Sequence, residues 1–488
     1  MTEVRTRFEP SPSGSIHVGT ALTASFNWLY ARRHGGKFVL RVADTDASRV
    51  VEEGLRSVVE DLRWLGLDWD EGPEVGGPDE PYFQSQRGEF YREAGARLLD
   101  GGHAYRCYCT SEELQAAREL ARAEGRPPRY QGRCRDLTAA ERAECDAEGR
   151  PAVVRFRVPE GETRVVDMVR GEVVFDHAQV EDFVIQRADG SALYNLAVSC
   201  DDLGMRITHI VRGEDIFSST PKQDMIMRAL GATELPVYGH MPLIVGSDRR
   251  PLSKRHGDTA VAQYREKGYL PEVLLNYLAT LNWSMGDGST ERFSVPELIA
   301  AFDPSGITRN PSAFDIEKLA AWNGERIRAM SPEEFAARAE PFMVEAGVLS
   351  EPVAGEARAV VLAMAPLVQE RMKRLDEAPG QLRFLFTEPE PDERARVLLT
   401  IERVPALEAA AEILERVEPW DAAAIQSALT EWADDAGIKR KEAFQPVRAA
   451  VTGTLVSPPL FESIQTLGRA RALARVRAAV ARARGTAS

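Results

Sequence analysis

The first eighty residues alternate between strand-like and helix-like segments in an order that few folds allow. Arg5–Phe8 lead into the turn Pro10–Gly14, and apolar residues then recur at helical spacing over Val18–Arg33. Lys37–Val42 form a nearly continuous apolar run, and a second helix is predicted over Val51–Leu65. Continuous apolar strands are typical of parallel sheets, and strand–helix–strand units cross over right-handedly. We therefore expect a doubly wound, Rossmann-like α/β sheet at the N-terminal end.

The rest of the chain changes character several times. Helical segments, cysteines and alternating strands are mixed after Pro81, and helices dominate beyond about Tyr269. Within the resumed α/β pattern, Tyr194–Val198 and Ile207–Val211 are predicted as strands and Thr220–Leu230 as a helix. The expected division is 1–80 and 191–245 for the two halves of the α/β domain, 81–190 for an α+β insertion, 246–329 for a basic loop with helices, and 330–488 for an all-helical part.

Composition limits the class of protein. The 488 residues carry a formal net charge of −14, and 44% of them are hydrophobic, as in globular proteins. No apolar stretch of about 18 residues predicts a membrane span, and MTEVRTRFEP lacks the apolar core of a secretion signal. Five unevenly spaced cysteines indicate a reducing compartment, so we expect a cytoplasmic protein.

The charge is unevenly distributed along the chain. Glu60–Glu80 hold eight acids and one base, whereas 467–488 hold six arginines and no acid. Taken alone, those arginines are typical of a solvated helix face. Phosphate contacts are local, however, so an acidic protein can still present a basic surface to nucleic acid.

A phosphate-binding pattern follows the first predicted strand. Pro10–Gly19 place a strand end, a tight turn and a helix N-terminus within ten residues. Helix N-termini bind phosphate through free N–H groups and their dipole. Gly19 allows close approach to the backbone, and His17 can donate a hydrogen bond to a phosphate oxygen.

A second phosphate-binding candidate is the basic loop Pro251–Gly257. Its lysine, Lys254, could neutralise a polyphosphate, whereas such a run alone is usually a solvated loop.

Together, Ser15–Gly19 and Leu252–Arg255 resemble the HIGH and KMSKS signatures of class I aminoacyl-tRNA synthetases. The resemblance narrows to bacterial-type glutamyl-tRNA synthetases through further motifs in the same order. These are Arg7–Gly14, Phe26–Leu29, Asp44–Asp46, Gln84–Arg87, Ala104–Cys109, Asp182–Ile185, Tyr194–Ala197, Asp201–Asp202, Thr208–Asp215, Thr220–Gln223, Phe444–Pro446 and Ser457–Phe461. The resemblance thus extends over essentially the whole chain.

The resemblance implies ATP-dependent activation of L-glutamate to glutamyl-adenylate and transfer to the 3′-terminal ribose of tRNA(Glu), with Mg²⁺, by a monomer. It implies catalytic roles for His17 and Lys254. The residues implied to bind ATP are His17, Gly19, Ser253, Lys254 and Arg255. Those implied to bind glutamate are Arg7, Ser11, Tyr194 and Arg212, since an arginine fork suits a carboxylate. Asp201 and Asp202 are expected to orient positive side chains or ribose.

Two residues depart from the family pattern. Glu9 stands where the family has a small residue, and Ala43 stands where it has the glutamate that contacts the substrate ammonium. Parallel strands flanking one helix can lie about 5 Å apart. We therefore expect Glu9 to take over the ammonium contact. An unrelated surface glutamate is one alternative, and an enzyme with impaired activity or altered specificity is another.

The cysteines Cys107, Cys109 and Cys134 have spacing that suits tetrahedral zinc and leaves a fourth position. The family resemblance makes Tyr130 the fourth ligand of a structural zinc, with a water or a histidine as alternatives in that position and free cysteines as the alternative to any metal.

The sequence also argues against three other functions. A truncated paralogue would lack the roughly 160 residues after Met330, and glutaminyl enzymes carry C-terminal β-barrels, whose strand alternation is absent from this sequence. A non-catalytic tRNA-binding relative would not need His17, Lys254, Arg7 and Arg212. Whether tRNA(Gln) is also charged stays open.

Overall fold

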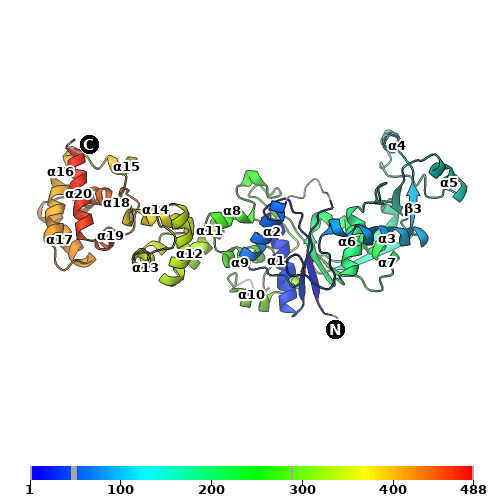
Figure 1. The fold of residues 1–488 in the computed structure, drawn as a ribbon, viewed down its shortest axis with the longest axis horizontal. Coiled ribbons are helices and arrows are strands. Elements are labelled where there is room, and N and C mark those ends of the chain that lie inside the picture. The colour runs from blue at the N-terminus through cyan, green and yellow to red at the C-terminus, as the bar shows by residue number, and fades with distance from the viewer. Residues whose placement is uncertain (1–2, 46–51, 287–289, 486–488) are drawn as a thin grey trace. The chain divides into compact units, whose positions relative to one another are not determined.

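The computed structural model describes residues 3–45, 52–286 and 290–485, and these form two compact units. Unit 1 comprises Met1–Arg265 and Leu274–Asp315, and unit 2 comprises Glu266–Val273 and Ile316–Ser488. The predicted α/β part lies in unit 1, and the predicted helical part lies in unit 2 (Figure 1).

Unit 1 is built on a six-stranded sheet in the order β2-β1-β8-β9-β5-β6. All neighbouring pairs are parallel except β5 and β6. The strands are β1 (Arg5–Phe8), β2 (Lys37–Leu40), β5 (Glu162–Asp167), β6 (Gly171–Asp176), β8 (His209–Gly213) and β9 (Val237–Met241). Strand β2 pairs with one edge of β1, and β8 pairs with the other edge. The direction in which strands are added to the sheet therefore reverses at β1. Ligands of doubly wound sheets bind at the carboxyl ends of the strands at such a reversal.

The predicted β-α-β unit is confirmed. Helix α1 has the predicted bounds, Val18–Arg33, and β2 ends at Leu40, two residues earlier than predicted. Helix α2 (Glu52–Leu65) matches the prediction except at Val51, which lies outside the described residues. The fully buried Asn27 ties α1 to the sheet, because its amide donates to Val211 O at 2.8 Å and its Oδ1 accepts from Val211 N.

One strand prediction was wrong. Tyr194–Val198 open helix α6 (Tyr194–Gly204), whereas the predicted strand Ile207–Val211 corresponds to β8 and the predicted helix Thr220–Leu230 to α7 (Thr220–Ala229). A short apolar run fits a buried helix as well as a strand. Here Leu196, Ala197 and Asp201 recur at helical spacing and are buried together, so the helix buries the run.

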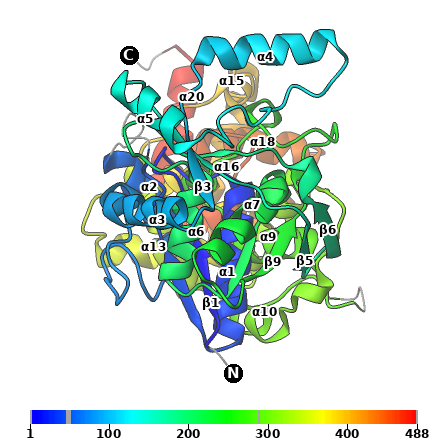
Figure 2. The same ribbon diagram turned by 90° about the vertical axis from the view of Figure 1, so that its right-hand side faces the viewer.

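The residues expected as an insertion form two kinds of structure. A three-stranded antiparallel sheet joins β3 (Ala104–Cys107), β4 (Val153–Phe156) and β7 (Val184–Gln186). Helices α4 (Ser111–Ala123) and α5 (Ala139–Ala147) extend from it, away from the main sheet (Figures 1 and 2). Strands β5 and β6 instead join the main sheet, and α3 (Gly88–Asp100) packs on α6.

The remaining described elements of unit 1 are short 3-10 helices, one pair of strands and three helices. They are the short 3-10 helices η2 (Gln84–Arg87), η3 (His177–Gln179), η4 (Glu214–Ser219), η5 (Lys254–His256) and η6 (Pro304–Gly306), the paired strands β10 (Ile244–Val245) and β11 (Ser312–Ala313), and helices α8 (Val261–Glu266), α9 (Pro271–Asn282) and α10 (Val295–Ala301). The first turn of α9 belongs to unit 2.

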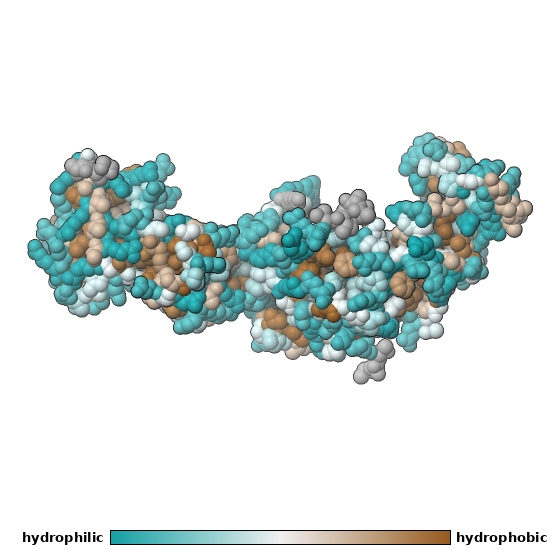
Figure 3. Space-filling model, in the orientation of Figure 1, coloured by the Kyte–Doolittle hydropathy of each residue, from teal (hydrophilic) through white to brown (hydrophobic). Residues whose placement is uncertain are grey.

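Unit 2 consists of helices in its described residues, as predicted. They are α11 (Ile316–Arg328), α12 (Pro332–Glu345), α13 (Gly355–Gln369), α14 (Ala378–Leu382), α15 (Glu393–Arg396), α16 (Val404–Arg416), α17 (Ala422–Asp435), α18 (Arg440–Thr452), α19 (Leu460–Leu467) and α20 (Arg469–Ala483), with η7 (Leu375–Glu377), η8 (Arg383–Leu385) and η9 (Ile401–Arg403). In Figure 3, hydrophilic residues cover most of the visible surface of each unit. None of the described helices is long and apolar enough to cross a membrane.

The C-terminal arginines are largely engaged within unit 2. Arg477 pairs with Glu415 at 2.9 Å and Arg484 with Glu408 at 2.7 Å, joining α20 to α16. Arg475 is buried and donates to Val451 O at 2.7 Å. These arginines therefore stabilise the helical packing; Arg477 and Arg484 agree with the interpretation as a solvated helix face, whereas the buried Arg475 does not.

Candidate active site

A cavity of about 440 Å³ opens at the carboxyl edge of the main sheet. Its lining residues come from the ends of β1, β2, β8 and β9, from the start of α1 and from α6. Of the predicted site residues, six lie on it: Arg7, Glu9, His17, Gly19, Tyr194 and Arg212. Ala43, Asp215 and Leu252 lie on it as well. Residues predicted from motifs up to 205 positions apart are thus brought together.

Some of the predicted site residues do not line the cavity. Ser11 is exposed in the turn after β1 and is not part of the lining. Ser253 and Arg255 lie beyond the lining residue Leu252, in the loop that holds Lys254 at the start of η5. That loop is closed on itself, since Ser253 N donates to His256 Nδ1 at 3.1 Å.

The loop before α1 is fixed against α2. A Cβ on Gly54 would lie 2.1 Å from Pro12 O, so only glycine lets α2 approach the turn this closely. Ser15 Oγ and Ile16 N both donate to Asp61 of α2, at 2.6 and 2.8 Å. The turn and α2 therefore set where α1 begins.

His17 is the N-cap of α1. Its Nδ1 accepts from Gly19 N at 3.1 Å, which fixes the proton of the neutral imidazole on Nε2. Burial lowers the pKa of His17, so the neutral form dominates near pH 7. The imidazole thus presents an N–H donor and no positive charge.

The two signature segments meet through the backbone. Val18 N donates to Thr259 O at 2.8 Å, and Val261 N donates to Ile16 O at 2.9 Å. This short antiparallel pairing joins the start of α1 to the stretch just after the Lys254 loop. Both segments therefore share one edge of the cavity.

Arg212 is buried, 3% exposed, and is held by neutral groups. Its three nitrogens donate to His240 Nε2, Gln223 Oε1 and Thr220 Oγ1, at 3.0, 2.7 and 2.8 Å. Among the described residues, no carboxylate lies within ion-pair distance of its guanidinium. A buried cation without a charge partner is costly unless a ligand supplies one.

Arg7 belongs to a buried charge network behind the cavity. Asp202 accepts from Arg7 Nε at 3.2 Å and from Arg41 at 2.9 Å. Burial would raise the pKa of Asp202, but Arg7 and Arg41 outweigh it and hold that pKa below its ordinary value. Asp201 accepts from Arg87, Gln84 and Tyr91. Both aspartates thus accept from arginine side chains, which agrees with the expectation that they orient positive side chains.

Glu9 lies beside Ala43, as predicted from the parallel strands. Ala43 N donates to Pro10 O at 3.0 Å, and Glu9 and Ala43 both line the cavity. The Glu9 carboxylate accepts from Arg41 at 2.8 Å and from Gln84 at 2.7 Å, and it lies 3.9 Å from Arg7. Glu9 is therefore part of the site and not an unrelated surface residue.

Several residues of the site were not predicted as such. Arg41 is fully buried and joins Glu9 to Asp201 and Asp202. His240 and Asp167 lie behind Arg212. A charged residue at the end of an otherwise apolar strand was the available signal for Arg41. The sequence gives no comparable signal for His240.

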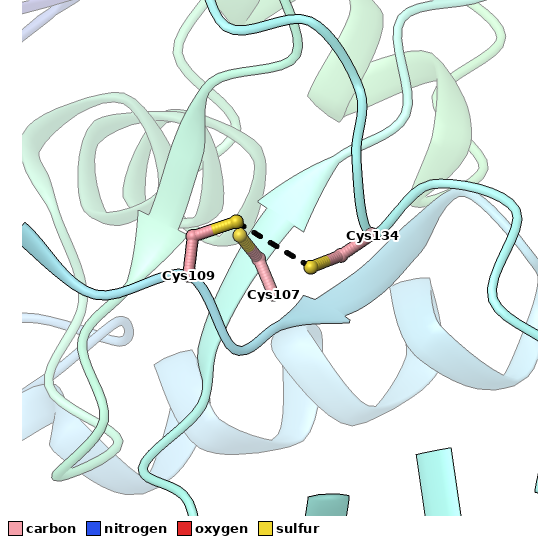
Figure 4. Close-up of side chains that lie close together, drawn as sticks. All are labelled: Cys107, Cys109 and Cys134. Carbon is pink, nitrogen blue, oxygen red and sulfur yellow. Dashed lines mark hydrogen bonds between the residues drawn. The ribbon is translucent and has the colours of Figure 1, made fainter. Parts of the chain in front are cut away.

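The cysteine cluster lies in unit 1, at β3 and the loop after α4. The sulfurs of Cys107, Cys109 and Cys134 all lie within 4.8 Å of one another and point toward one place (Figure 4). Cys109 and Cys134 are 3.6 Å apart, close to the separation of about 3.8 Å that two thiolates have on a tetrahedral zinc with bonds of about 2.3 Å. Tyr130 Oη lies 3.5 Å from Cys107 Sγ. The three sulfurs fit three ligands of a structural zinc, and the Tyr130 hydroxyl lies beside them.

The fold and the comparisons with known proteins define the class. Residues 3–321 match the family of class I tRNA synthetases (E and Q), catalytic domain, and residues 334–480 match the anticodon binding domain family. The chain has the catalytic and anticodon-binding parts of a class I aminoacyl-tRNA synthetase.

Relatives narrow the class further. Glutamate–tRNA ligases of Nocardioides sp. and Symbiobacterium thermophilum are each 46% identical to the chain, over 98% and 97% of it and 98% and 99% of their own length. A crystal structure of a glutamate tRNA ligase from Elizabethkingia meningosepticum, in complex with its amino acid, has a TM-score of 0.85 at 29% identity, covering 98% of this chain and 99% of that one. The chain belongs to the glutamate–tRNA ligase family.

Proposed function

We propose that the chain is a glutamate–tRNA ligase whose amino acid site is the cavity at the carboxyl edge of the main sheet. In the first step an α-carboxylate oxygen of glutamate bonds to the α-phosphorus of ATP, and pyrophosphate leaves with the electron pair of the broken P–O bond. In the second, the 3′-terminal ribose hydroxyl of tRNA attacks the acyl carbon, loses its proton, and AMP leaves. The observation that carries this proposal is the buried Arg212 with no carboxylate partner among the described residues.

Recognition of the side-chain carboxylate falls to Arg212 and Arg7. Both guanidinium groups line the cavity, and a fork of N–H donors matches a carboxylate. Tyr194 lies at the cavity rim, 46% exposed, where its hydroxyl can add a hydrogen bond. Ser11, exposed in the adjacent turn, would contribute only if that turn moves toward the ligand.

Glu9 supplies a negative group for the substrate ammonium. Arg41 and Gln84 hold its carboxylate on the cavity wall, next to the position where Ala43 leaves room. The network around it contains three guanidinium groups, of Arg7, Arg41 and Arg87, and three carboxylates, of Glu9, Asp201 and Asp202. Arg212 adds to this wall a positive charge that no carboxylate among the described residues contacts directly, which suits the side-chain carboxylate of glutamate.

The triphosphate is bound where the two signature segments meet. His17 can donate from Nε2 to a phosphate oxygen, and Gly19 gives the backbone close access. Lys254, with Ser253 and Arg255, neutralises the charge that develops on the leaving pyrophosphate. Magnesium ion accompanying ATP adds to that neutralisation. The protein thus aligns reactants and stabilises charge, and needs no general base for adenylation.

We also propose a structural zinc held by Cys107, Cys109, Cys134 and Tyr130. Metal analysis of purified protein tests this directly. We expect close to one zinc per chain in the wild type and much less in Cys109→Ser. Cys145→Ser, which changes a half-buried cysteine outside the cluster, is the matched control. Less than a tenth of a zinc per wild-type chain would reject the site.

Further parts of the proposal concern partners and organisation. Unit 2, which contains the anticodon-binding match, is the part we expect to read tRNA(Glu). We propose the five-part division of the chain that the sequence predicts. We also expect a monomer, which light scattering tests, and a cytoplasmic location, which cell fractionation tests.

The deciding experiment is ATP–pyrophosphate exchange with labelled pyrophosphate, run with and without tRNA(Glu). We expect exchange with glutamate in the presence of tRNA(Glu), and none with glutamine or aspartate. Parallel charging of purified tRNA(Glu) and tRNA(Gln) decides whether one or both are substrates. No exchange with glutamate in the presence of tRNA(Glu) would refute the proposal and would favour a non-catalytic tRNA-binding protein.

A further inference from the structure

A buried histidine and aspartate lie directly behind Arg212. His240 of β9 is 0% exposed, and its Nδ1 donates to Asp167 Oδ2 of β5 at 2.6 Å. Its Nε2 accepts from Arg212 Nε at 3.0 Å. The direction of these bonds is fixed, because the guanidinium can only donate and the ionised carboxylate can only accept. The imidazole is therefore the neutral tautomer with its proton on Nδ1.

Asp167 is itself fixed by the backbone. Its Oδ1 accepts from Val169 N at 2.8 Å and from Arg170 N at 2.9 Å, and its Oδ2 accepts from His240 N at 3.1 Å. The carboxylate is 2% exposed and cannot rotate without breaking these bonds. Asp167 thus determines which imidazole nitrogen carries the proton.

We propose that Asp167 and His240 are positioning residues that aim Arg212 into the amino acid cavity while leaving its charge free for the substrate. Neither residue lines the cavity, so both act on the ligand through Arg212 and through Thr220, whose Oγ1 accepts from Arg212 and lies 3.2 Å from His240 Nε2. The inference rests on the proposed role of Arg212 in binding the substrate side-chain carboxylate.

The use of a neutral imidazole has a physical reason. A carboxylate in direct contact with Arg212 would neutralise the guanidinium and weaken its attraction for the ligand. The lone pair on His240 Nε2 accepts from Arg212 Nε and so orients the guanidinium. The imidazole ring also separates the negative charge of Asp167 from Arg212. Burial lowers the pKa of His240, and the positive charge of Arg212 acts in the same direction against the opposing effect of Asp167.

The substitution Asp167→Asn tests the tautomer. The amide oxygen can still accept from Val169 N, Arg170 N and, at 3.3 Å, His240 N. The amide nitrogen then faces His240 Nδ1, although it can no longer accept from His240 N as Oδ2 does. The amide then donates to Nδ1 and drives the imidazole proton to Nε2. That N–H would point at Arg212 Nε–H, and two donors repel. Arg212 would lose its orientation without any change in the residues that line the cavity.

We expect the glutamate KM of Asp167→Asn to rise about 10- to 100-fold, the range typical of lost supporting contacts, with the ATP KM within about threefold of wild type. Nitrogen-15 NMR of histidine-labelled, substrate-free protein should show the His240 ring switching from the Nδ1–H to the Nε2–H tautomer. Asp182→Asn is the matched control, because Asp182 is also buried but accepts from Val158 N at 2.8 Å and from Tyr105 Oη at 2.7 Å; it should leave the glutamate KM and the His240 tautomer unchanged.

A second pair of variants keeps the inference testable if Asp167→Asn does not fold. The amide oxygen of His240→Gln can accept from Arg212 Nε, whereas His240→Leu offers no acceptor. We expect the glutamate KM of His240→Gln to stay closer to wild type than that of His240→Leu. An unchanged tautomer or an unchanged glutamate KM in Asp167→Asn, or equal KM values in the two His240 variants, would overturn the inference. Failure of the wild type to activate glutamate would instead refute the proposed function, whatever the NMR result.

Discussion

Removing the Glu9 carboxylate should weaken binding of the substrate ammonium and little else. In Glu9→Ala, Arg41 keeps Asp202 at 2.9 Å, and Gln84 keeps Asp201 at 2.9 Å, so the network behind the cavity retains partners for both side chains. A hydrogen bond between charged groups contributes about 1.5–3 kcal/mol, which corresponds to a rise of about 10- to 150-fold in the glutamate KM. We expect the KM for ATP to change little, because Glu9 lies on the amino acid side of the cavity.

The charge of Glu9 can be separated from its shape. Glu9→Gln keeps an amide oxygen able to accept from Arg41 but removes the negative charge, so its glutamate KM should rise nearly as much as that of Glu9→Ala. The double variant Glu9→Ala with Ala43→Glu moves the carboxylate to the neighbouring strand end and should recover most of the loss. Steady-state charging of tRNA(Glu) with varied glutamate measures all of these variants.

A deaminated analogue separates an ammonium contact from an indirect effect. Glutarate has both carboxylates of glutamate and no ammonium, so its inhibition constant should change less than about threefold in Glu9→Ala, since it never made the lost contact. Glu9 also lies 3.9 Å from Arg7, and a role in holding Arg7 would weaken glutarate and glutamate alike. Equal weakening of both ligands, or an unchanged glutamate KM, would refute the ammonium contact.

Three further variants test other parts of the structure. Arg212→Lys replaces a fork with a point charge and should lower kcat/KM for glutamate by about 30- to 1000-fold, equivalent to ~2–4 kcal/mol, with the ATP KM nearly unchanged in the same kinetics. His17→Asn keeps an N-cap acceptor for α1 but removes the Nε2 donor, so the melting temperature should hold while exchange slows by about 100-fold or more; a lowered melting temperature with full activity would contradict this. Glu71→Gln weakens the buried pair with Arg5, whose two bonds to Glu71 measure 2.6 and 2.8 Å, while Asp79 keeps its contact with Arg5 at 3.1 Å; it should lower the free energy of unfolding at pH 7 by about 1.5–3 kcal/mol. Because the Arg5 hydrogen bond holds the pKa of Glu71 below its ordinary value of 4.5, that stability is present above pH 4.5 and is lost as pH falls through the lower folded value, so denaturation curves of variant and wild type should converge in acid and diverge near neutrality.

The sequence predicted local elements well where one periodicity dominated. The bounds of α1 followed from apolar residues at helical spacing after the turn Pro10–Gly14, and the structure has them at Val18 and Arg33. Tyr194–Val198 failed because five mostly apolar residues carry no period that separates strand from helix. The adjacency of Glu9 and Ala43 was predictable because it depends only on two parallel strands flanking one helix.

The site was predictable only where motifs mark it. His17, Arg7 and Arg212 stand in recognisable segments, and the structure brings all three to one cavity. Arg41, Asp167 and His240 act through other side chains, and their partners lie between 28 and 164 residues away. No local pattern expresses such distances, so these roles become visible only when the strands are placed side by side.

The order of the strands explains why these distant residues act together. Asp167 ends β5, His240 lies in β9 and Arg212 lies in β8, and these three strands are neighbours in the sheet. The next strand in the sheet is β1, which carries Arg7 near its end. Arg7 shares Asp202 as a hydrogen-bond acceptor with Arg41, which follows β2. The cations and their partners thus run across the sheet in one continuous row at its carboxyl edge. A substrate with two carboxylates and one ammonium meets groups whose charges are already set by buried neighbours, so little reorganisation is needed on binding. A change at any member of the row should therefore act on glutamate binding before it acts on ATP, because we propose that the phosphates of ATP bind at the helix N-terminus and the Lys254 loop instead.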